Sequence, residues 1–265
     1  MKDIIKNDFI ELSNRIRKRI VAIGTESQYK AVHYGGALSM VEIISFIYSC
    51  YININKDDAT NISRDRFILS KGHACLAQYA ALIEMGLIEE KSLNFEENGS
   101  YFAGHPVINR ENFIDFSTGS LGNGLAYAIG CCVANPSRNV ACVIGDGELG
   151  EGSIWESFRI AKTLKLKNLL VFIDINNFQQ TGSTESINGL IDYKVALTAF
   201  GWNVVMINGN SIDDFLKLKQ KLSDTLPNVV LAKTLKGFGI KSIENTLDSH
   251  HTFIKNTVEI FQHRG

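Results

Sequence analysis

The sequence predicts an α/β fold, in which a parallel sheet carries helices on both faces. Two segments, 139–145 and 168–175, are continuous apolar runs typical of strands that are buried on both sides. Segments with helical periodicity separate such runs, so strands and helices alternate along the chain. The 265 residues suffice for one large α/β domain or two small ones.

The expected elements follow one another in a regular order. Residues 4–23 have the spacing of an amphipathic helix, and residues 35–52 that of a largely buried one. The segment "RFILS" predicts a strand that runs into a helix starting near His73 and closed by Gly86. The other expected helices cover 125–135, 151–165 and 211–224, and the other expected strands cover 139–145, 168–175, 202–208 and 228–234.

Composition narrows the classes of partner. The formal net charge is -1, which gives no electrostatic basis for a nucleic acid or an anionic membrane as the main partner. No segment has the length of a membrane span or the apolar core of a signal peptide. The five cysteines contain no CxxC pair and mostly lie in apolar patterns. We therefore expect buried, reduced thiols in a cytoplasmic protein.

A carboxylate between two glycines, Gly145-Asp146-Gly147, ends the strand expected at 139–145. Ligands of parallel sheets bind at the carboxyl ends of strands, and a helix N-terminus there favours a diphosphate. A divalent cation would remove the repulsion between Asp146 and phosphate, and Mg²⁺ accepts protein and phosphate oxygens together. A simple strand-to-helix turn capped by Asp146 is the alternative.

Asn176 follows the next expected strand, thirty residues after Asp146. One βαβ step separates the two residues, so we expect their side chains to be neighbours at the edge of the sheet. An amide oxygen and a backbone carbonyl can complete an oxygen shell around Mg²⁺ or Ca²⁺. Turn chemistry at Asn176-Asn177 is the alternative.

Six segments, taken together, resemble the transketolase family. They occur in the family's order between about residues 30 and 251. They are "VHYGGALSM", "DRFILSKGHA", "GHP" at 104–106, "STGSLGNG", "GDGELGEGSIWES" and "KGFGIKSIENTLDSHH". Glycine, aspartate and a later asparagine at this spacing form the thiamine diphosphate motif. The resemblance implies the thiamine diphosphate-binding fold, with residues 1–265 as one diphosphate-binding domain.

Four of the six histidines, His33, His73, His105 and His250, fall on active-site positions of the family. Taken alone, each of these histidines would be interpreted as a structural or surface residue. Because all four lie in glycine-containing segments at these positions, together they favour an active-site role. Imidazoles titrate near neutral pH, which suits contacts and proton transfer to substrate hydroxyls and carbonyls. Apart from adjacent His250 and His251, no two histidines have a usual zinc-ligand spacing.

The resemblance also implies roles for individual residues. The implied metal ligands are Asp146, Asn176 and the backbone carbonyl of Phe178. The implied cofactor contacts are Gly147, His73 and His250 at the diphosphate, the backbone of Gly119 and Leu121 at the aminopyrimidine, and Gly145 and Glu148. The implied catalytic residues are His33, His105 and His250, which would line the substrate channel. Lys236 is a further candidate for a phosphate contact.

Two acidic residues, Glu151 and Glu156, match positions that link two active sites across the family's dimer interface. An exposed helix face is the alternative for both. We expect the family's pyrimidine-binding domain on a separate chain. The resemblance therefore implies the N-terminal subunit of a split transketolase. Such a chain would be active with a C-terminal partner chain, as an α₂β₂ heterotetramer acting on sugar phosphates or related ketoses and aldoses.

The chain departs from the family pattern near the substrate channel. Val32, Tyr34 and Ser120 stand where the family usually has Gly, Pro and Pro. Because Tyr34 adjoins a proposed substrate histidine, we expect a specialised sugar pathway rather than the pentose phosphate pathway.

Other interpretations of the motifs remain open. The thiamine diphosphate motif alone also suits the alpha subunit of a 2-oxo acid dehydrogenase or decarboxylase, or a fragment like 1-deoxyxylulose 5-phosphate synthase. The "LSKGH" and "GHP" segments favour transketolase. A non-catalytic subunit that kept the fold is a further alternative, because fold alone does not give function.

Overall fold

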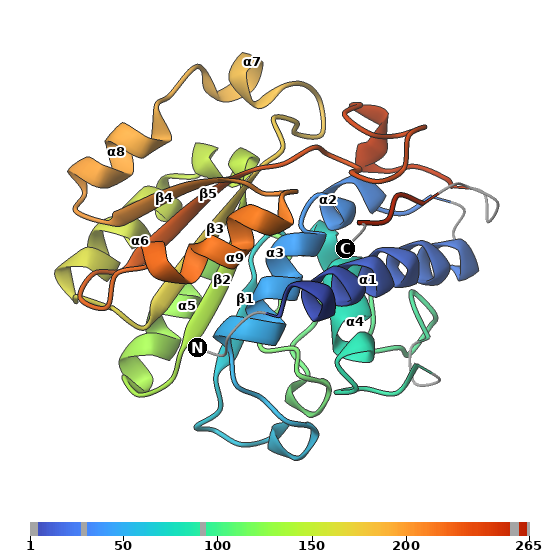
Figure 1. Cartoon of the computed structure of the whole chain (residues 1–265), viewed down its shortest axis with the longest axis horizontal. Helices are drawn as coiled ribbons and strands as arrows, with labels where there is room; N and C mark the ends of the chain where they lie inside the picture. Colours follow the sequence, from blue (N-terminus) through green and yellow to red (C-terminus); the bar gives the residue numbers. More distant parts are fainter. Residues whose placement is uncertain (1–4, 28–30, 91–93, 255–259, 264–265) are drawn as a thin grey trace.

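The computed structural model describes residues 5–27, 31–90, 94–254 and 260–263 (Figure 1). Its sheet has five parallel strands in the order β1-β2-β3-β5-β4. The strands are β1 (Arg66–Leu69), β2 (Val140–Gly145), β3 (Leu169–Ile175), β4 (Asn203–Asn208) and β5 (Asn228–Lys233). The α-helices are α1 (Lys6–Glu26), α2 (Tyr34–Leu38), α3 (Val41–Phe46), α4 (Cys75–Glu84), α5 (Gly124–Ala134), α6 (Gly152–Thr163), α7 (Thr184–Asn188), α8 (Tyr193–Ala199) and α9 (Ile212–Leu218). The predicted parallel α/β fold is confirmed.

Short helical turns connect several of these elements. They are η1 (Ile47–Tyr51), η2 (Lys56–Asp58), η3 (Gly72–Ala74), η5 (Arg110–Asn112), η6 (Asp146–Gly150), η7 (Lys219–Lys221) and η8 (Asp248–His250). Within the described residues, no helix has both the length and the apolar character needed to cross a membrane. All five cysteines lie in the described part of the chain and form no disulfide with one another.

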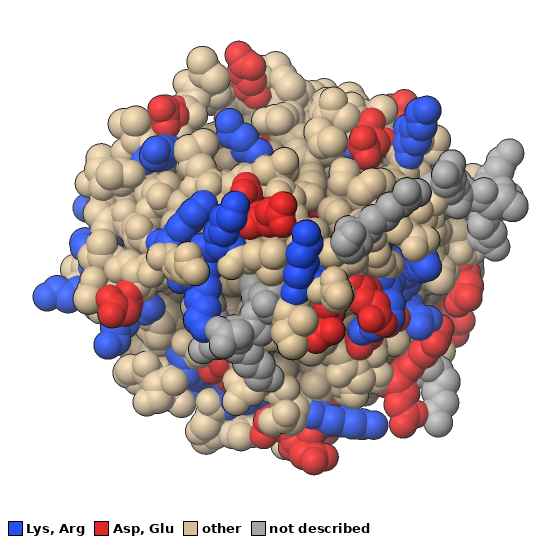
Figure 2. All heavy atoms as spheres, in the orientation of Figure 1, with Lys and Arg blue, Asp and Glu red and all other residues tan. Residues whose placement is uncertain are grey.

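Two hydrophobic cores cover the two faces of the sheet. Successive side chains of a strand point to opposite faces, so β3 contributes Leu170 and Phe172 to one core and Val171 and Ile173 to the other. Helices α1, α3, α4 and α9 pack on the first face, and α5, α6 and α8 on the second (Figure 1). Figure 2 shows acidic and basic side chains interspersed over one face of the molecule.

The prediction of one continuous helix over residues 35–52 is wrong. The structure divides it into α2, α3 and the π-helical turn η1, with a break at Ser39 and Met40. The hydroxyl of Ser39 contacts both the carbonyl oxygen of Gly36 and the carboxylate of Asp174. This tie to β3 fixes the chain where one helix ends and the next begins.

Smaller differences concern helix ends. The helix expected from His73 begins as the 3₁₀ turn η3 and becomes α-helical at Cys75, while Gly86 closes it with a left-handed φ of 68°. The helix expected over 211–224 ends as the 3₁₀ turn η7. The sequence pattern did not predict α7 and α8, whose N-caps are Ser183 and Asp192.

Candidate functional site

A cavity of about 540 Å³ opens at the carboxyl ends of β2 and β3. Strand register creates it: Gly145 pairs with Asp174, so the residues following both strands emerge side by side. The cavity is lined by His33, Lys71, His73, His105, Gly119, Leu121, Gly145, Asp146, Gly147, Glu148, Asn176, Phe178, Gln179, Gln180, Thr181, Lys236 and His250. Every predicted catalytic, cofactor and metal residue is among them. Glu151 and Glu156 are not; both are exposed on or beside α6.

Asp146 is 2% exposed at the start of η6. Its Oδ1 accepts from the amide of Gly147 at 2.9 Å, and its Oδ2 from the amide of Asn177 at 2.8 Å and the hydroxyl of Thr184 at 2.9 Å. Burial, followed by the charge of Asp174, raises the pKa of Asp146 to about 6. A carboxylate so placed is stabilised in its ionised form by a cation.

The predicted metal ligands form a donor set of oxygens only. Asp146, Asn176 and Phe178 line the same cavity, and the described residues hold no group of three His, Cys, Asp or Glu able to bind a metal. One carboxylate, one amide oxygen and one carbonyl suit Mg²⁺ or Ca²⁺ when phosphate oxygens supply further ligands. The residues present therefore fit a metal held jointly with a diphosphate.

The carboxylate of Glu148 accepts hydrogen bonds from three segments that surround the cavity. Its Oε1 accepts from the hydroxyl of Ser70 at 2.6 Å and the amide of Gly122 at 3.0 Å. Its Oε2 accepts from the amide of Gly145 at 3.0 Å. Glu148 is 1% exposed, and this burial raises the pKa of its carboxyl. The side chain thus fixes the glycine-rich backbone that faces the cavity.

The four predicted histidines cluster around His33. Its ring centroid lies 5.2 Å from that of His250, 5.7 Å from His105 and 6.0 Å from His73. His251 joins them at 4.8 Å from His33, a contact that the sequence pattern did not predict. The cluster joins segments that are far apart in the chain: the residue before α2, the turn η3 before α4, the residue after Gly104, and the turn η8.

Burial is the main cause of the lowered histidine pKa values, and for His33, His73 and His250 the neighbouring histidines and lysines lower them further. The pKa of His33 and of His250 falls to about 4, and that of His73 lies well below its ordinary value. The pKa of His105 is lowered as well. At neutral pH these imidazoles are uncharged, so each ring has one donor nitrogen and one acceptor nitrogen.

Two lysines reach the cavity. Lys71, which is 1% exposed, forms an ion pair with Asp174, which is fully buried. The ammonium of Lys236 lies 3.1 Å from the carbonyl oxygen of Gln179 and 3.3 Å from Nδ1 of His250. Burial and the charge of Lys71 lower the pKa of Lys236 to about 8. Sequence reasoning missed Lys71, although it stands inside the "LSKGH" motif.

The arrangement agrees with a known family. A family model described as "Transketolase, thiamine diphosphate binding domain" matches residues 11–264. The chain belongs to the transketolase family.

Transketolase relatives cover most of the chain. It is 35% identical over 246 residues to an apulose-4-phosphate transketolase subunit of Phocaeicola vulgatus, covering 90% of this chain and 86% of the relative. It is 35% identical over 240 residues to the transketolase of Homo sapiens, of which it spans only 38%. The transketolase structure from Leishmania mexicana superposes with a TM-score of 0.82 at 25% identity, covering 95% of this chain and 39% of that one.

These matches confirm the transketolase family and the thiamine diphosphate-binding domain that the motifs predicted. They support a transketolase subunit, because two relatives of similar length are each named as one subunit of an apulose-4-phosphate transketolase. The alternatives, part of a 2-oxo acid dehydrogenase or decarboxylase and a 1-deoxyxylulose 5-phosphate synthase fragment, are not favoured.

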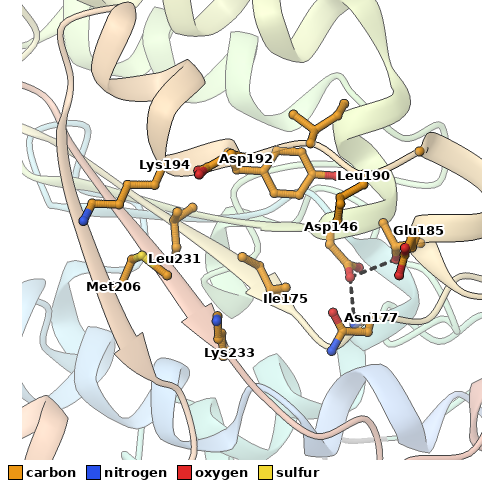
Figure 3. A pocket seen from close by; sticks show the side chains of 14 residues that line it. Asp146, Ile175, Asn177, Glu185, Leu190, Asp192, Lys194, Met206, Leu231 and Lys233 are labelled. Carbon is orange, nitrogen blue, oxygen red and sulfur yellow. Dashed lines mark hydrogen bonds between the residues drawn. The ribbon is translucent and has the colours of Figure 1, made fainter.

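The transketolase domain has a second cavity, of about 460 Å³, which is also lined by Asp146. Figure 3 shows its wall toward the sheet, made by Ile175, Met206 and Leu231. Leu190 and Lys194 approach from α8 and the segment before it (Figure 3). Asp146, which accepts hydrogen bonds from Asn177 and Thr184, lines both cavities.

Proposed function

We propose that this chain is the thiamine diphosphate-binding subunit of a split transketolase, which transfers a two-carbon ketol unit between sugar phosphates. One observation carries the proposal: Asp146, Asn176 and Phe178 share a single cavity with His33, His73, His105 and His250. The relatives named as single subunits support the division between two chains. Thiamine diphosphate, when bound, supplies the carbanion chemistry of the transfer.

The chain's own residues would hold and orient the cofactor. In this proposal Asp146, Asn176 and the carbonyl of Phe178 bind Mg²⁺ or Ca²⁺. Gly147, His73 and His250 contact the diphosphate, where Lys236 adds a positive charge. The backbone at Gly119 and Leu121 supports the aminopyrimidine. Glu148 acts on the cofactor through Gly122 and Gly145, whose amides its carboxylate binds.

The uncharged histidines would handle the substrate. His33, His105 and His250 can each accept a proton or hydrogen bond from a substrate hydroxyl and donate one to a carbonyl oxygen. Their lowered pKa values keep an acceptor nitrogen available across the neutral range. We propose sugar phosphates as substrates, with apulose 4-phosphate, named in two of the relatives, tested beside xylulose 5-phosphate.

The second chain would complete the site. We propose a C-terminal partner that carries a pyrimidine-binding domain, in an α₂β₂ heterotetramer. Glu151 and Glu156 are exposed and available to a neighbouring protomer, which supports their placement at a shared interface. The chain itself, over residues 1–265, acts in this proposal as one diphosphate-binding domain.

Reconstitution tests this proposal. The chain is mixed with a candidate partner, thiamine diphosphate and Mg²⁺, and ketol transfer is followed with phosphorylated ketose donors and aldose acceptors. We expect transfer by the mixture and none by either chain alone. Transfer by this chain alone would refute the split site, and CO₂ release from 2-oxo acids would indicate a different enzyme.

A matched pair of variants localises the cofactor. Asp146→Asn should abolish Mg²⁺-dependent binding of thiamine diphosphate, because the carboxylate is lost from the donor set. Asp192→Asn changes an exposed carboxylate that caps α8 and lies outside the first cavity, so binding should be retained. Equal binding by both variants would contradict the assigned site.

A further inference from the structure

Asp174 is the one charged residue of β3, and its carboxylate is fully buried. Its Oδ2 accepts from the hydroxyl of Ser39 at 2.6 Å, from the amide nitrogen of Asn176 at 3.1 Å, and from the ammonium of Lys71. Its Oδ1 accepts from the hydroxyl of Thr234. Four donors from separate segments therefore converge on one carboxylate beside the first cavity.

The contact with Asn176 fixes which way its amide points. An ionised carboxylate has only acceptors, so the side chain of Asn176 must turn its NH₂ group toward Asp174. Its oxygen then points away from Asp174 and accepts from the amide of Phe178 at 3.1 Å. A carbonyl-type oxygen has two lone pairs, so one stays available to a cation. In the flipped orientation, NH₂ would face the metal position.

The Lys71 ammonium balances the charge of this buried carboxylate. Without that pairing, two uncompensated carboxylates, Asp146 and Asp174, would lie in one buried region, where the second charge already acts on the pKa of the first. Asp174 can thus orient Asn176 while Asp146 supplies the carboxylate for the cation.

We propose that Asp174 is a positioning residue, which holds the amide oxygen of Asn176 toward the cation and thereby sets its affinity. This inference rests on the proposed function, in which Asn176 is a metal ligand. Partners that orient metal ligands typically change metal affinity by about 10- to 100-fold when they are removed. The contact is made within β3 and the residue after it, so it belongs wholly to this chain.

The test measures, by calorimetric titration, the Mg²⁺ concentration that half-saturates thiamine diphosphate binding to the full chain mixed with its partner chain. In Asp174→Asn the new amide offers both an acceptor oxygen and a donor NH₂ group, so it no longer fixes the orientation of the Asn176 amide. The Mg²⁺ concentration needed for half-saturation should therefore rise by about tenfold or more. Asn176→Asp places two carboxylates together and should also weaken binding. In the double variant, Asp174→Asn with Asn176→Asp, the amide at position 174 donates to the carboxylate at position 176. Its half-saturating Mg²⁺ concentration should return to within about threefold of wild type.

Two controls separate positioning from general damage. Ser39→Ala and Thr234→Val each remove another hydrogen bond to the same carboxylate and leave Asn176 paired. Both should lower thermal stability yet keep the Mg²⁺ requirement within about twofold of wild type. A purely structural role would make these variants and Asp174→Asn behave alike.

Three outcomes would overturn the inference. One is a folded Asp174→Asn chain with an unchanged Mg²⁺ requirement. The second applies even if Asp174→Asn does not fold: tighter Mg²⁺ binding by Asn176→Asp would show that Asp174 does not constrain position 176. The third is a wild-type chain that, mixed with its partner chain, shows no Mg²⁺-dependent thiamine diphosphate binding, which would overturn the proposed cofactor site together with this inference.

Discussion

The carboxylate of Glu148 accepts a hydrogen bond from the hydroxyl of Ser70 at 2.6 Å, although the two residues are 78 positions apart in the chain. The same carboxylate accepts from the amides of Gly122 and Gly145. One buried side chain therefore joins the end of β1, the loop before α5 and the end of β2. These are the segments that line the first cavity, so the site depends on this contact.

Glu148→Gln should destabilise the chain by about 1–3 kcal/mol, because either orientation of the new amide turns its NH₂ group toward a backbone N–H. Urea unfolding measures the change. Glu111→Gln, at an exposed position, should change stability by less than about 0.5 kcal/mol. Equal stability of the two variants would show that the three hydrogen bonds to Glu148 contribute little.

Replacing each of two glycines of α5 by alanine should change the stability of the chain in opposite directions. A Cβ on Gly124 would lie 2.5 Å from the Cβ of Ser70, so Gly124→Ala should cost about 1–3 kcal/mol. A Cβ on Gly130 would meet nothing within 4 Å, and Gly130→Ala should stabilise the helix by about 0.5–1 kcal/mol. Thermal unfolding of the two variants checks the signs; a stabilising Gly124→Ala would contradict the packing.

Stability should fall in mild acid because His33 resists protonation in the folded chain. Its folded pKa is about 4, below the ordinary value of 6.5, so the unfolded chain binds more protons between these values. This loss of stability is absent above about pH 6.5 and grows as the pH falls from about 6.5 toward about 4. The raised pKa of Asp146 acts with the opposite sign, so a comparison between variants is needed.

His33→Gln should remove part of this acid sensitivity. We expect its unfolding free energy to decline less than that of wild type between about pH 7 and about pH 5, as measured by urea titration at each pH. His263→Gln is the control at a histidine outside the cluster. Parallel pH profiles for His33→Gln and wild type would contradict the assigned pKa.

Arg17 and Glu42 form an ion pair whose side chains are fully buried between α1 and α3. Glu42→Gln should cost about 3–5 kcal/mol, because a buried guanidinium loses its counter-charge. Glu11→Gln removes a partner of Arg15 whose side chain is 70% exposed, and should cost less than about 1 kcal/mol. Urea unfolding compares them, and a cost below about 1 kcal/mol for Glu42→Gln would contradict the expected desolvation effect.

The parallel sheet could be predicted because its central strands are apolar on both faces. The run at 168–175 contributes alternate side chains to both cores, as its continuous apolarity indicates. The strand order could not be predicted, since β5 lies between β3 and β4 and hydropathy carries no information on adjacency. The break after α2 also escaped prediction, because it depends on Ser39 reaching Asp174, 135 positions away.

The candidate site was predicted largely through motifs, and its predicted lining residues do share one cavity. Lys71, Asp174 and His251 were missed. An acid inside the otherwise apolar run "NLLVFIDI" was the available signal for Asp174, because a buried charge requires a partner. The partner itself, Lys71, is 103 positions away and only the fold brings it close.

The convergence on Asp174 has a consequence for synthesis on the ribosome. Its partners Ser39 and Thr234 stand 135 positions before it and 60 positions after it. A nascent chain therefore cannot complete this network until residue 234 has left the exit tunnel. Contacts of such sequence separation form late in folding, so the first cavity should be among the last regions to become protected from proteolysis.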